Sequence, residues 1–600
     1  MIRQGLLHGA NGPAALLRRR RGGGSAFVTG VLHRSLHEGR TVLDASIRQN
    51  DHVIQVYGAN TEVGKTVVTV GLLRAATLQG LRASYIKPVQ AGSPSDASFV
   101  SRHVGPACRA STIFDYTDPV SPHLAAARDG AVAPDDDIVE AVVKEIKVAL
   151  SGSSGDGHEH GGEGRSGNLV LVESAGGVLS PAPSGSLQAD AFRPIRLPVL
   201  LVGDGRLGGI GATLSALESL RTRGYSVLGV ALITQDKSLG NTEAISHHAG
   251  PIPVFELPAL PPADQPLDTW YDANAESFEN LLGSLAARRA AGARELAGMK
   301  MRGRKALWWP FTQHDLLSDE DVNILDSAYG DYFCMAQVEG SGEETRVSHH
   351  ALLDACASWW THGAGHGSPG MALAVAEAAG RYGHVIFPGN IHAPALEARR
   401  RLVDGPGRGW ASRVFYTDNG STATEVAIKM GFRRFLTDRF GSSEPPPGTR
   451  LSVVAQEDCY HGDTLGAMNV AVPSVFNEGQ HAWYQARGLF LKTPNVSWRD
   501  GRFTVELPTE MTASAAAAAV TGSEMALGSR DAAFDFATRD AGDLASLYRE
   551  HVRSKMDEFE GKDGAILGSL LLEPIVMGAG GMIFVDPLFQ RVLVQVSNAR

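Results

Sequence analysis

The sequence predicts an α/β protein with a doubly wound parallel sheet in its N-terminal half and a second, incomplete α/β domain after it. Three observations support this fold class. Short apolar strands alternate with helical stretches from residue 52 onward, a glycine-rich turn joins the first strand to its helix, and the composition becomes aromatic after residue 306. Alternating strands and helices are typical of a parallel sheet covered by helices on both faces.

Composition limits the classes of function. The 600 residues allow about four domain equivalents, and 43% hydrophobic with 20% charged residues is a globular balance. The net charge of −10 argues against a protein that mainly neutralises nucleic-acid phosphates. No apolar run approaches the roughly 18 residues of a membrane span. Four cysteines without a CxxC pair indicate a reducing compartment.

The composition of the N-terminal segment predicts a targeting signal. The first 37 residues contain the arginine run Arg18–Arg21, and no acidic residue precedes Glu38. An arginine-rich, acid-free start is typical of an organelle import presequence, and we expect residues 1–45 to be a disordered mitochondrial presequence. The alternative is a basic disordered tail without a targeting role. The segment is left out of the fold.

A phosphate-binding loop is predicted at the start of the first domain, which we place at residues 50–285. The apolar strand Val53–Tyr57 leads into a turn that ends in Gly-Lys-Thr, and a helical stretch follows. This is the context that a P-loop requires, with Lys65 reaching the terminal phosphates and the Thr66 hydroxyl binding Mg²⁺. Five residues separate its glycines where the standard loop has four, and a glycine turn with an incidental lysine is the alternative. The predicted ATP-binding residues of the loop are Gly58, Asn60, Thr61, Glu62, Val63, Gly64, Lys65 and Thr66.

Charged residues follow the next strands. Further strands are predicted at Ala83–Ile86, Leu169–Val172, Val199–Val202, Leu228–Ile233 and Pro253–Leu257. Lys87 and Asp96 come after the first of these, and Glu173 after the second. Alone, Lys87 would be a surface lysine and Asp96 a helix cap. Because ligands bind at the carboxyl ends of parallel strands, we expect these groups to form one Mg–ATP phosphoryl-transfer site.

These motifs resemble dethiobiotin synthetase over residues 53–260. The resemblance is carried by Gly58–Thr66, Lys87-Pro88-Val89-x-x-Gly92, Ser95-Asp96-Ala97, Ser121-Pro122-His123 and Val172-Glu173-x-Ala175-Gly176-Gly177. It implies that CO₂ adds to 7,8-diaminononanoate as a carbamate, that ATP phosphorylates the carbamate, and that the second amine closes the ring. It also implies catalytic roles for Lys65 and Lys87, a magnesium site at Thr66, Asp96 and Glu173, and ATP contacts from Glu173, Ser174, Ala175 and Gly176.

Two positions depart from that family's pattern. Ala91 stands at a substrate-binding position where bacterial members have a serine, so one hydroxyl contact is lost or moved. Ile233-Thr234 replaces the Asn-Asp pair that reads adenine. The nucleotide preference therefore stays open.

The second domain is predicted to span residues 306–600, after a linker or closing helix at 286–305. Its motifs are paired tryptophans at Trp308-Trp309 and Trp359-Trp360, the small polar run Asp418–Thr422, Tyr460–Asp463, and Leu572–Val576 followed by Gly578-Ala579-Gly580-Gly581. Tryptophan pairs are usually core or interface, and small polar residues at a helix start are first a cap and second an anion site.

In this order the motifs resemble the class III aminotransferases, and specifically those that make 7,8-diaminononanoate. The resemblance implies a fold-type I pyridoxal-phosphate enzyme, with Gly420 and Ser421 binding the cofactor phosphate. Tyr460 would lie against the pyridine ring, and Trp359, Trp360 and Tyr460 would line the site for 8-amino-7-oxononanoate. It further implies S-adenosylmethionine as amino donor and a homodimer. Together the halves resemble the bifunctional biotin-synthesis enzymes of plants and fungi.

One requirement of pyridoxal-phosphate chemistry is not met before residue 600. The reaction needs an acid at the pyridinium nitrogen and a Schiff-base lysine. The family carries both beyond the Glu-Pro and glycine segment, whereas Met582–Arg600 contains no lysine. From these 600 residues we expect no transamination through an internal aldimine and a poorly stable second domain with an incomplete sheet.

Two other readings compete with the enzyme. The first is a switch-type P-loop ATPase that binds partners, a class that usually carries an extra lysine early in its loop; Ala59–Val63 contains none. The second treats residues 308–600 as a scaffold or dimerisation piece.

Overall fold

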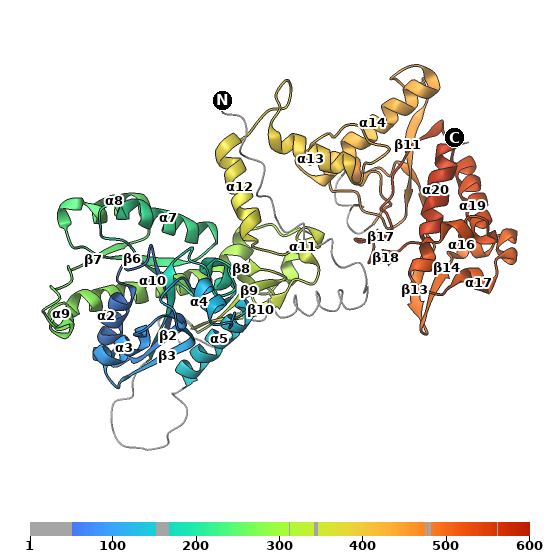
Figure 1. The fold of residues 1–600 in the computed structure, drawn as a ribbon. Helices are drawn as coiled ribbons and strands as arrows, with labels where there is room; N and C mark the ends of the chain where they lie inside the picture. The colour runs from blue at the N-terminus through green and yellow to red at the C-terminus, as the bar shows by residue number, and fades with distance from the viewer. Residues whose placement is uncertain are drawn as a thin grey trace, which may run out of the picture. The chain divides into compact units, whose positions relative to one another are not determined.

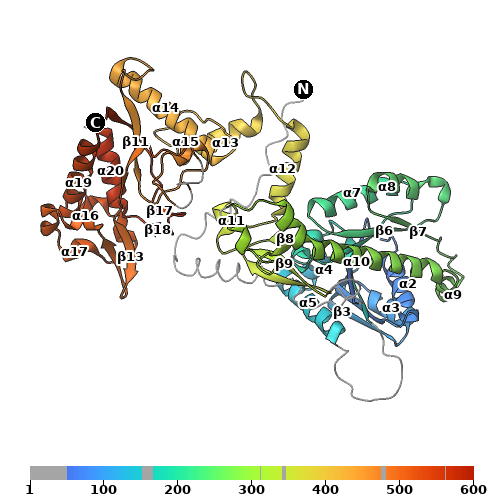
Figure 2. The ribbon, with the colours of Figure 1, turned by 180° about the vertical axis from the view of Figure 1, so that it is seen from behind.

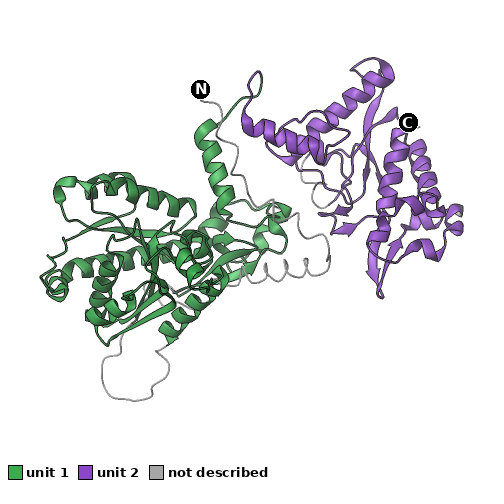
Figure 3. Ribbon diagram, viewed as in Figure 1, with its two compact units in different colours: residues 1–388 green, residues 389–600 purple. Residues whose placement is uncertain are grey.

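The computed structural model describes residues 51–151, 167–310, 312–340, 346–474, 477, 482–560 and 562–600. The chain forms two compact units, Met1–Pro388 and Gly389–Arg600 (Figure 3). The predicted presequence at 1–45 lies outside the described residues. Within them, no helix combines the length and the apolar character needed to cross a bilayer.

Unit 1 is built on a parallel sheet of seven strands (Figure 1). Its spatial order is β3-β2-β4-β1-β5-β6-β7, so β2, β3 and β4 lie on one side of the first strand and β5, β6 and β7 on the other. The strands are β1 (His52–Gly58), β2 (Arg82–Ala91), β3 (Cys108–Tyr116), β4 (Asn168–Gly177), β5 (Val199–Val202), β6 (Val227–Ile233) and β7 (Val254–Leu257). The doubly wound sheet predicted from the alternating pattern is confirmed.

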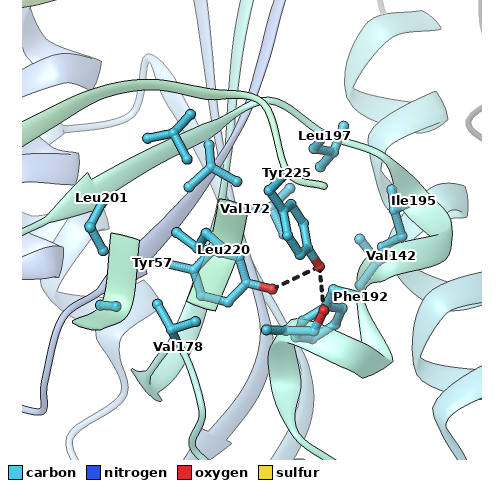
Figure 4. Packing of buried hydrophobic residues seen from close by; sticks show 14 of the residues in the cluster. Tyr57, Val142, Val172, Val178, Phe192, Ile195, Leu197, Leu201, Leu220 and Tyr225 are labelled. Carbon is cyan, nitrogen blue, oxygen red and sulfur yellow. Dashed lines mark hydrogen bonds between the residues drawn. The ribbon is translucent and has the colours of Figure 1, made fainter. Parts of the chain in front are cut away.

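Helices cover both faces because the strands are apolar on both sides. One face packs against α2 (Lys65–Leu78), α3 (Asp96–Val104), α9 (Leu267–Ala273) and α10 (Ala275–Ala306). The other packs against α4 (Pro122–Arg128), α5 (Asp135–Ser151), α7 (Gly209–Thr222) and α8 (Asn241–Ala249). On this second face Tyr57 and Tyr225 are buried, with their hydroxyls 3.4 Å apart (Figure 4).

The sheet differs from the prediction in one strand and two lengths. β3 is an edge strand that was not predicted, because polar and apolar residues over Cys108–Tyr116 are mixed without regular alternation. Once β3 is present, β2 extends to Ala91, which pairs with Tyr116. Lys87 therefore lies within β2, and Glu173 lies within β4 opposite Val56, rather than beyond the strand ends.

The segment at 286–305 continues helix α10, which packs against α2, β8 and β9 (Figure 2). The antiparallel strands β8 (Ile324–Tyr329), β9 (Tyr332–Glu339) and β10 (Arg346–Leu353) follow, then α11 (Ala357–Trp360) and α12 (Pro369–Tyr382). Because β8 and β9 pack on α10, unit 1 runs past residue 306 to Pro388. The domain limits inferred from the sequence stay a prediction.

Unit 2 has its own apolar core. A parallel sheet of order β12-β11-β16 comprises β11 (Arg450–Gln456), β12 (Gly488–Leu491) and β16 (Ala565–Leu570). An antiparallel sheet comprises β13 (Asn495–Arg499), β14 (Arg502–Glu506) and β15 (Ala526–Leu527), and β17 (Val576–Met577) pairs with β18 (Ile583–Phe584). The longer helices are α13 (Ala393–Asp404), α14 (Gly420–Phe440), α19 (Asp543–Glu560) and α20 (Pro587–Asn598).

Candidate active site

The phosphate loop connects β1 to α2. Gly64 caps the helix in the left-handed region (φ +88°) and offers no side chain to its N–H groups. Glu62 also has a positive φ, of 58°. Because no side chain caps the first turn, its backbone N–H groups and the helix dipole are available to bind phosphate.

Lys65 lies back across the loop against Gly58. A Cβ on Gly58 would stand 2.7 Å from the Asn60 carbonyl oxygen and 2.9 Å from Lys65 Cδ, so glycine here leaves room for both the loop backbone and the lysine. Lys65 is buried, and this burial lowers the pKa of its ammonium group; nearby Lys87 lowers it further, while Glu173 and Asp96 raise it. This environment suits a lysine whose ammonium group is stabilised by the phosphates of a bound nucleotide.

Glu173 connects the loop to the neighbouring strands. Its carboxylate is fully buried and accepts hydrogen bonds from Thr66 Oγ1 (2.9 Å) and Thr69 Oγ1 (3.0 Å), both on α2. Lys87 Nζ donates to Glu173 Oε1 at 2.9 Å from β2. Because β4 lies between β2 and β1, one carboxylate reaches both.

Lys87 is held by two acids. Its Nζ lies 2.6 Å from Asp96 Oδ2 at the start of α3 and 2.9 Å from Glu173 Oε1, and it donates to the Ser174 carbonyl at 3.3 Å. Burial alone would lower the pKa of Lys87, but Glu173 and Asp96 raise it above its usual value. The lysine therefore carries its charge at neutral pH and lies on the same edge of the sheet as the phosphate loop.

The oxygen donors of the cluster fit Mg²⁺. The hydroxyl of Thr66 and the carboxylates of Asp96 and Glu173 are hard oxygen ligands, and Mg²⁺ is commonly held by one or two carboxylates together with substrate phosphates and waters. Thr66 Oγ1 and Glu173 Oε1 are 2.9 Å apart, and Lys87 joins Glu173 to Asp96. The three predicted metal residues are thus brought together.

The other predicted ATP residues surround the loop. Asn60 Oδ1 accepts a hydrogen bond from Thr61 N at 2.8 Å, and Val63 is buried. Gly177 lies against the loop, where a Cβ would be 3.4 Å from the Ala59 carbonyl oxygen. Gly176 has φ +76° and, like Ser174 and Ala175, belongs to the end of β4. Ala91, the predicted substrate contact, ends β2.

Two polar residues of the cluster were missed by sequence reasoning. Thr69 lies one helical turn after Thr66, and this spacing was the available signal for a second hydroxyl on the same face. Gln90 Oε1 accepts from Asp96 N at 3.2 Å, and its Nε2 donates to the Gly92 carbonyl at 3.1 Å. Gln90 therefore positions Asp96, a role that no local motif indicates.

Ile233 packs directly on the phosphate loop. A Cβ on Gly64 would stand 2.6 Å from Ile233 Cδ1, and Gly64 already has φ +88°. We expect Gly64→Ala to weaken ATP binding by about tenfold or more, because both backbone strain and this clash move the helix N-terminus. Titration calorimetry with ATP measures the change. Gly80→Ala, which also has positive φ (+75°) but open space around it, controls for strain alone and should leave affinity unchanged.

The predicted cofactor residues of the second domain lie in unit 2, whereas two of its predicted substrate residues lie in unit 1. In unit 2, Ser421 at the N-terminus of α14 has its Oγ 2.7 Å from Thr464 Oγ1 and accepts from Thr464 N at 3.0 Å. A Cβ on Gly462 would be 2.2 Å from Ser421 Oγ, so the loop after Tyr460 passes closely over Ser421. Trp359 and Trp360 belong to unit 1, where both are exposed.

Tyr460 stands beside this helix start. Its hydroxyl donates to Asp463 Oδ2 at 2.9 Å, and its backbone N donates to Glu573 Oε2 at 3.1 Å. Burial and Asp463 raise the pKa of Tyr460 to about 12. A helix N-terminus with a hydroxyl and a flanking aromatic ring fits the phosphate and the ring of pyridoxal phosphate.

The sequence matches two described families. Residues 52–266 match the family described as an AAA domain, and residues 333–499 match aminotransferase class-III.

Several named relatives are similar over most of the chain. The Emericella nidulans protein named bifunctional dethiobiotin synthetase/adenosylmethionine-8-amino-7-oxononanoate aminotransferase is 39% identical over 90% of this chain and 68% of its own length. The Arabidopsis thaliana protein named bifunctional dethiobiotin synthetase/7,8-diamino-pelargonic acid aminotransferase, mitochondrial, is 35% identical over 95% of this chain and 74% of its own. The ATP-dependent dethiobiotin synthetase BioD of Neorickettsia sennetsu is 31% identical over 34% of this chain and 86% of its own length.

Proposed function

Because the chain belongs to the family of bifunctional dethiobiotin synthetase/aminotransferases, we propose that Lys65, Lys87 and Glu173 carry its ATP-dependent step. The chain is an enzyme of biotin biosynthesis in which a dethiobiotin synthetase is joined to an aminotransferase-like domain. The observation that supports these residues is the position of Lys87 Nζ, 2.9 Å from Glu173 Oε1, which also accepts from Thr66 of the phosphate loop.

The proposed reaction uses each group of the cluster. Diaminononanoate and CO₂ form a carbamate at one amine, with loss of a proton. The carbamate oxygen attacks the γ-phosphorus of ATP, and ADP leaves. The second amine then attacks the carbonyl carbon, closes the ring and expels phosphate. Charge on the carbamate and the transferred phosphoryl group would be stabilised by Lys65, Lys87 and the Mg²⁺ held at Thr66, Asp96 and Glu173, because preorganised cations in a water-poor site act strongly.

A substrate-dependence assay tests this proposal. The purified chain is mixed with MgATP, diaminononanoate and bicarbonate, and ADP release and dethiobiotin are measured by coupled assay and mass spectrometry. We expect ADP release to require both co-substrates and to match dethiobiotin mole for mole. Hydrolysis that ignores diaminononanoate would instead support the switch-type ATPase.

The pKa of Lys65 predicts a pH dependence of ATP binding. Burial lowers this pKa below the usual 10.5, so free Lys65 loses its charge at a lower pH than an exposed lysine. Bound phosphates favour the charged form and raise the pKa again. ATP affinity should therefore fall as pH rises through the pKa of free Lys65, and over that range binding should be accompanied by proton uptake. Calorimetry in buffers of different ionisation enthalpy measures that uptake; Lys65→Arg should abolish the dependence.

For the second domain we propose pyridoxal phosphate as the cofactor. When bound it supplies an electron sink for transfer of an amino group. Gly420 and Ser421 would hold its phosphate at the start of α14, and Tyr460 would lie against its ring. Trp359 and Trp360 would contact 8-amino-7-oxononanoate, with S-adenosylmethionine as donor. Quenching of tryptophan or cofactor fluorescence on titration with pyridoxal phosphate tests binding; no saturable change would contradict it.

We propose a mitochondrial location and a homodimer. The arginine-rich first 37 residues support the location, and the Arabidopsis thaliana and Oryza sativa relatives are named mitochondrial. A fluorescent protein fused to residues 1–50 should enter mitochondria, and a fusion with residues 18–21 changed to glutamine should not. Light scattering on the purified chain measures its mass in solution.

A further inference from the structure

Three potential metal ligands meet on the antiparallel sheet of unit 1. Asp326, Cys334 and His349 come from β8, β9 and β10, and one carboxylate oxygen, the thiol sulfur and one imidazole nitrogen all lie within 4.8 Å of one another. Cys334 is 3% exposed, while Asp326 remains reachable from solvent. The group lies outside the ATP cluster and outside the residues assigned to the second domain's cofactor.

The register of the strands explains why these side chains share a face. On β9, Cys334 and Ala336 are two residues apart and point the same way. Ala336 pairs with His349 of β10, so His349 points to that face as well. Between Leu325 and Ser327 the register of β8 shifts, which leaves Asp326 as an extra residue opposite β9. Such a bulge re-aims a side chain and recurs beside functional sites.

The chemistry of the three ligands favours a borderline-soft divalent ion. Thiolate, imidazole and carboxylate together are typical zinc ligands, with three protein ligands leaving one position for water. Ligand atoms around tetrahedral Zn²⁺ are about 3.6 Å apart, and those of the cluster lie within 4.8 Å, so binding would draw them together by about 1 Å at most. A thiolate in the set disfavours Mg²⁺ and Ca²⁺, which take oxygen ligands.

We propose that Asp326, Cys334 and His349 form a binding site for a divalent ion of this class, with Zn²⁺ as its occupant. Binding displaces the Cys334 thiol proton to solvent and leaves the thiolate on the metal. Burial raises the pKa of this thiol to about 11, so the metal must supply the driving force.

Two neighbours support the site. Arg196 Nη2 donates to Asp326 Oδ2 at 2.8 Å, and an outer hydrogen bond of this kind orients a ligating carboxylate. Ser327, which pairs with Cys334, has a buried hydroxyl without a hydrogen-bond partner among the described residues. Arg196 belongs to the segment before β5, so its ion pair with Asp326 links the β8–β10 sheet to the parallel sheet.

Cobalt binding tests the site directly. The purified 600-residue chain is stripped with a chelator and titrated with Co²⁺, which gives a thiolate charge-transfer band in the near ultraviolet and visible d–d bands when bound by cysteine. We expect saturation at one ion per chain, and one retained Zn²⁺ by mass spectrometry after gel filtration. Absence of stoichiometric binding would overturn the proposal.

Matched variants locate the ion. Cys334→Ser should remove the charge-transfer band and weaken Zn²⁺ binding at least a hundredfold, and His349→Asn should weaken it at least tenfold while keeping the band. Cys108→Ser removes another buried cysteine, on β3, and should change neither. If Cys334→Ser does not fold, the Zn²⁺ affinities of His349→Asn and Asp326→Asn test the site instead. Zn²⁺ affinity equal to that of the parent chain in both variants would contradict the assignment. Zn²⁺ should raise the melting temperature of the parent chain and not of the weakened variants.

Discussion

Replacing Lys87 with methionine is expected to lower kcat/KM for dethiobiotin formation by about a hundred- to a thousandfold, which is the usual loss when one preorganised electrostatic group is removed. Methionine keeps most of the lysine's length and removes its charge, so the loss reports on charge stabilisation during phosphoryl transfer. ADP release and dethiobiotin formation should fall together. ATP binding should remain, because Lys65 and the loop backbone are untouched.

The control for this variant separates chemistry from folding. Lys87→Met leaves the buried Glu173 carboxylate without its ammonium partner, and a buried unpaired charge destabilises a fold. Thermal unfolding must therefore be measured beside the rates, at a temperature where the variant is folded. Lys237→Met removes an exposed lysine, paired with Glu256 at 2.8 Å, and should leave both the reaction rates and the thermal unfolding unchanged. A folded Lys87→Met enzyme with the parent rate would remove Lys87 from the mechanism.

Replacing Asp586 with asparagine is expected to destabilise unit 2 by about 3–5 kcal/mol, the usual cost of breaking a buried ion pair from one side. Asp586 is fully buried and accepts from both Nη atoms of Arg539 at 2.8 Å. It also accepts from the Tyr548 hydroxyl at 2.9 Å and from Leu588 N at the start of α20 at 3.1 Å. Asparagine keeps the shape but leaves the Arg539 charge unmatched.

Denaturant unfolding, followed by fluorescence, measures this free energy. Glu558→Gln breaks the exposed pair between Glu558 of α19 and Lys562, which follows the helix, and should cost about 0.5 kcal/mol or less. Equal losses in the two variants would show that burial does not set the value of the Asp586 pair. A chain that lost the ATP-dependent activity as well would show that the two units unfold together.

Local patterns predicted the parts of the fold that depend on local chemistry. The strand, glycine turn and helix at 53–80 are contiguous, so the phosphate loop could be recognised without knowing the sheet. By contrast, Lys87 and Glu173 are 86 residues apart, and their contact depends on β4 lying between β2 and β1. Sequence reasoning could join them only by placing both residues after strands of one parallel sheet, and the family resemblance then supplied their roles.

Features set by pairing between strands were not predictable in this way. β3 has a mixed polar pattern, and only its pairing with β2 makes it a strand. The bulge at Asp326 depends on the register of β8 against β9, which no periodicity in a six-residue strand specifies. Gln90 acts through the backbone N of Asp96, and a side chain that binds main chain leaves no motif.

The central position of β4 has a consequence for hydrogen exchange. Glu173 lies on β4 between the strands that carry Lys87 and the phosphate loop, and the surrounding side chains are buried on both faces. Backbone amides in such a strand exchange only when the whole cooperative unit opens. The amides of Ile86, Val172 and Val56 should therefore exchange among the slowest in the chain. Lys87, Glu173 and the phosphate loop should likewise keep their spacing until the parallel sheet itself unfolds.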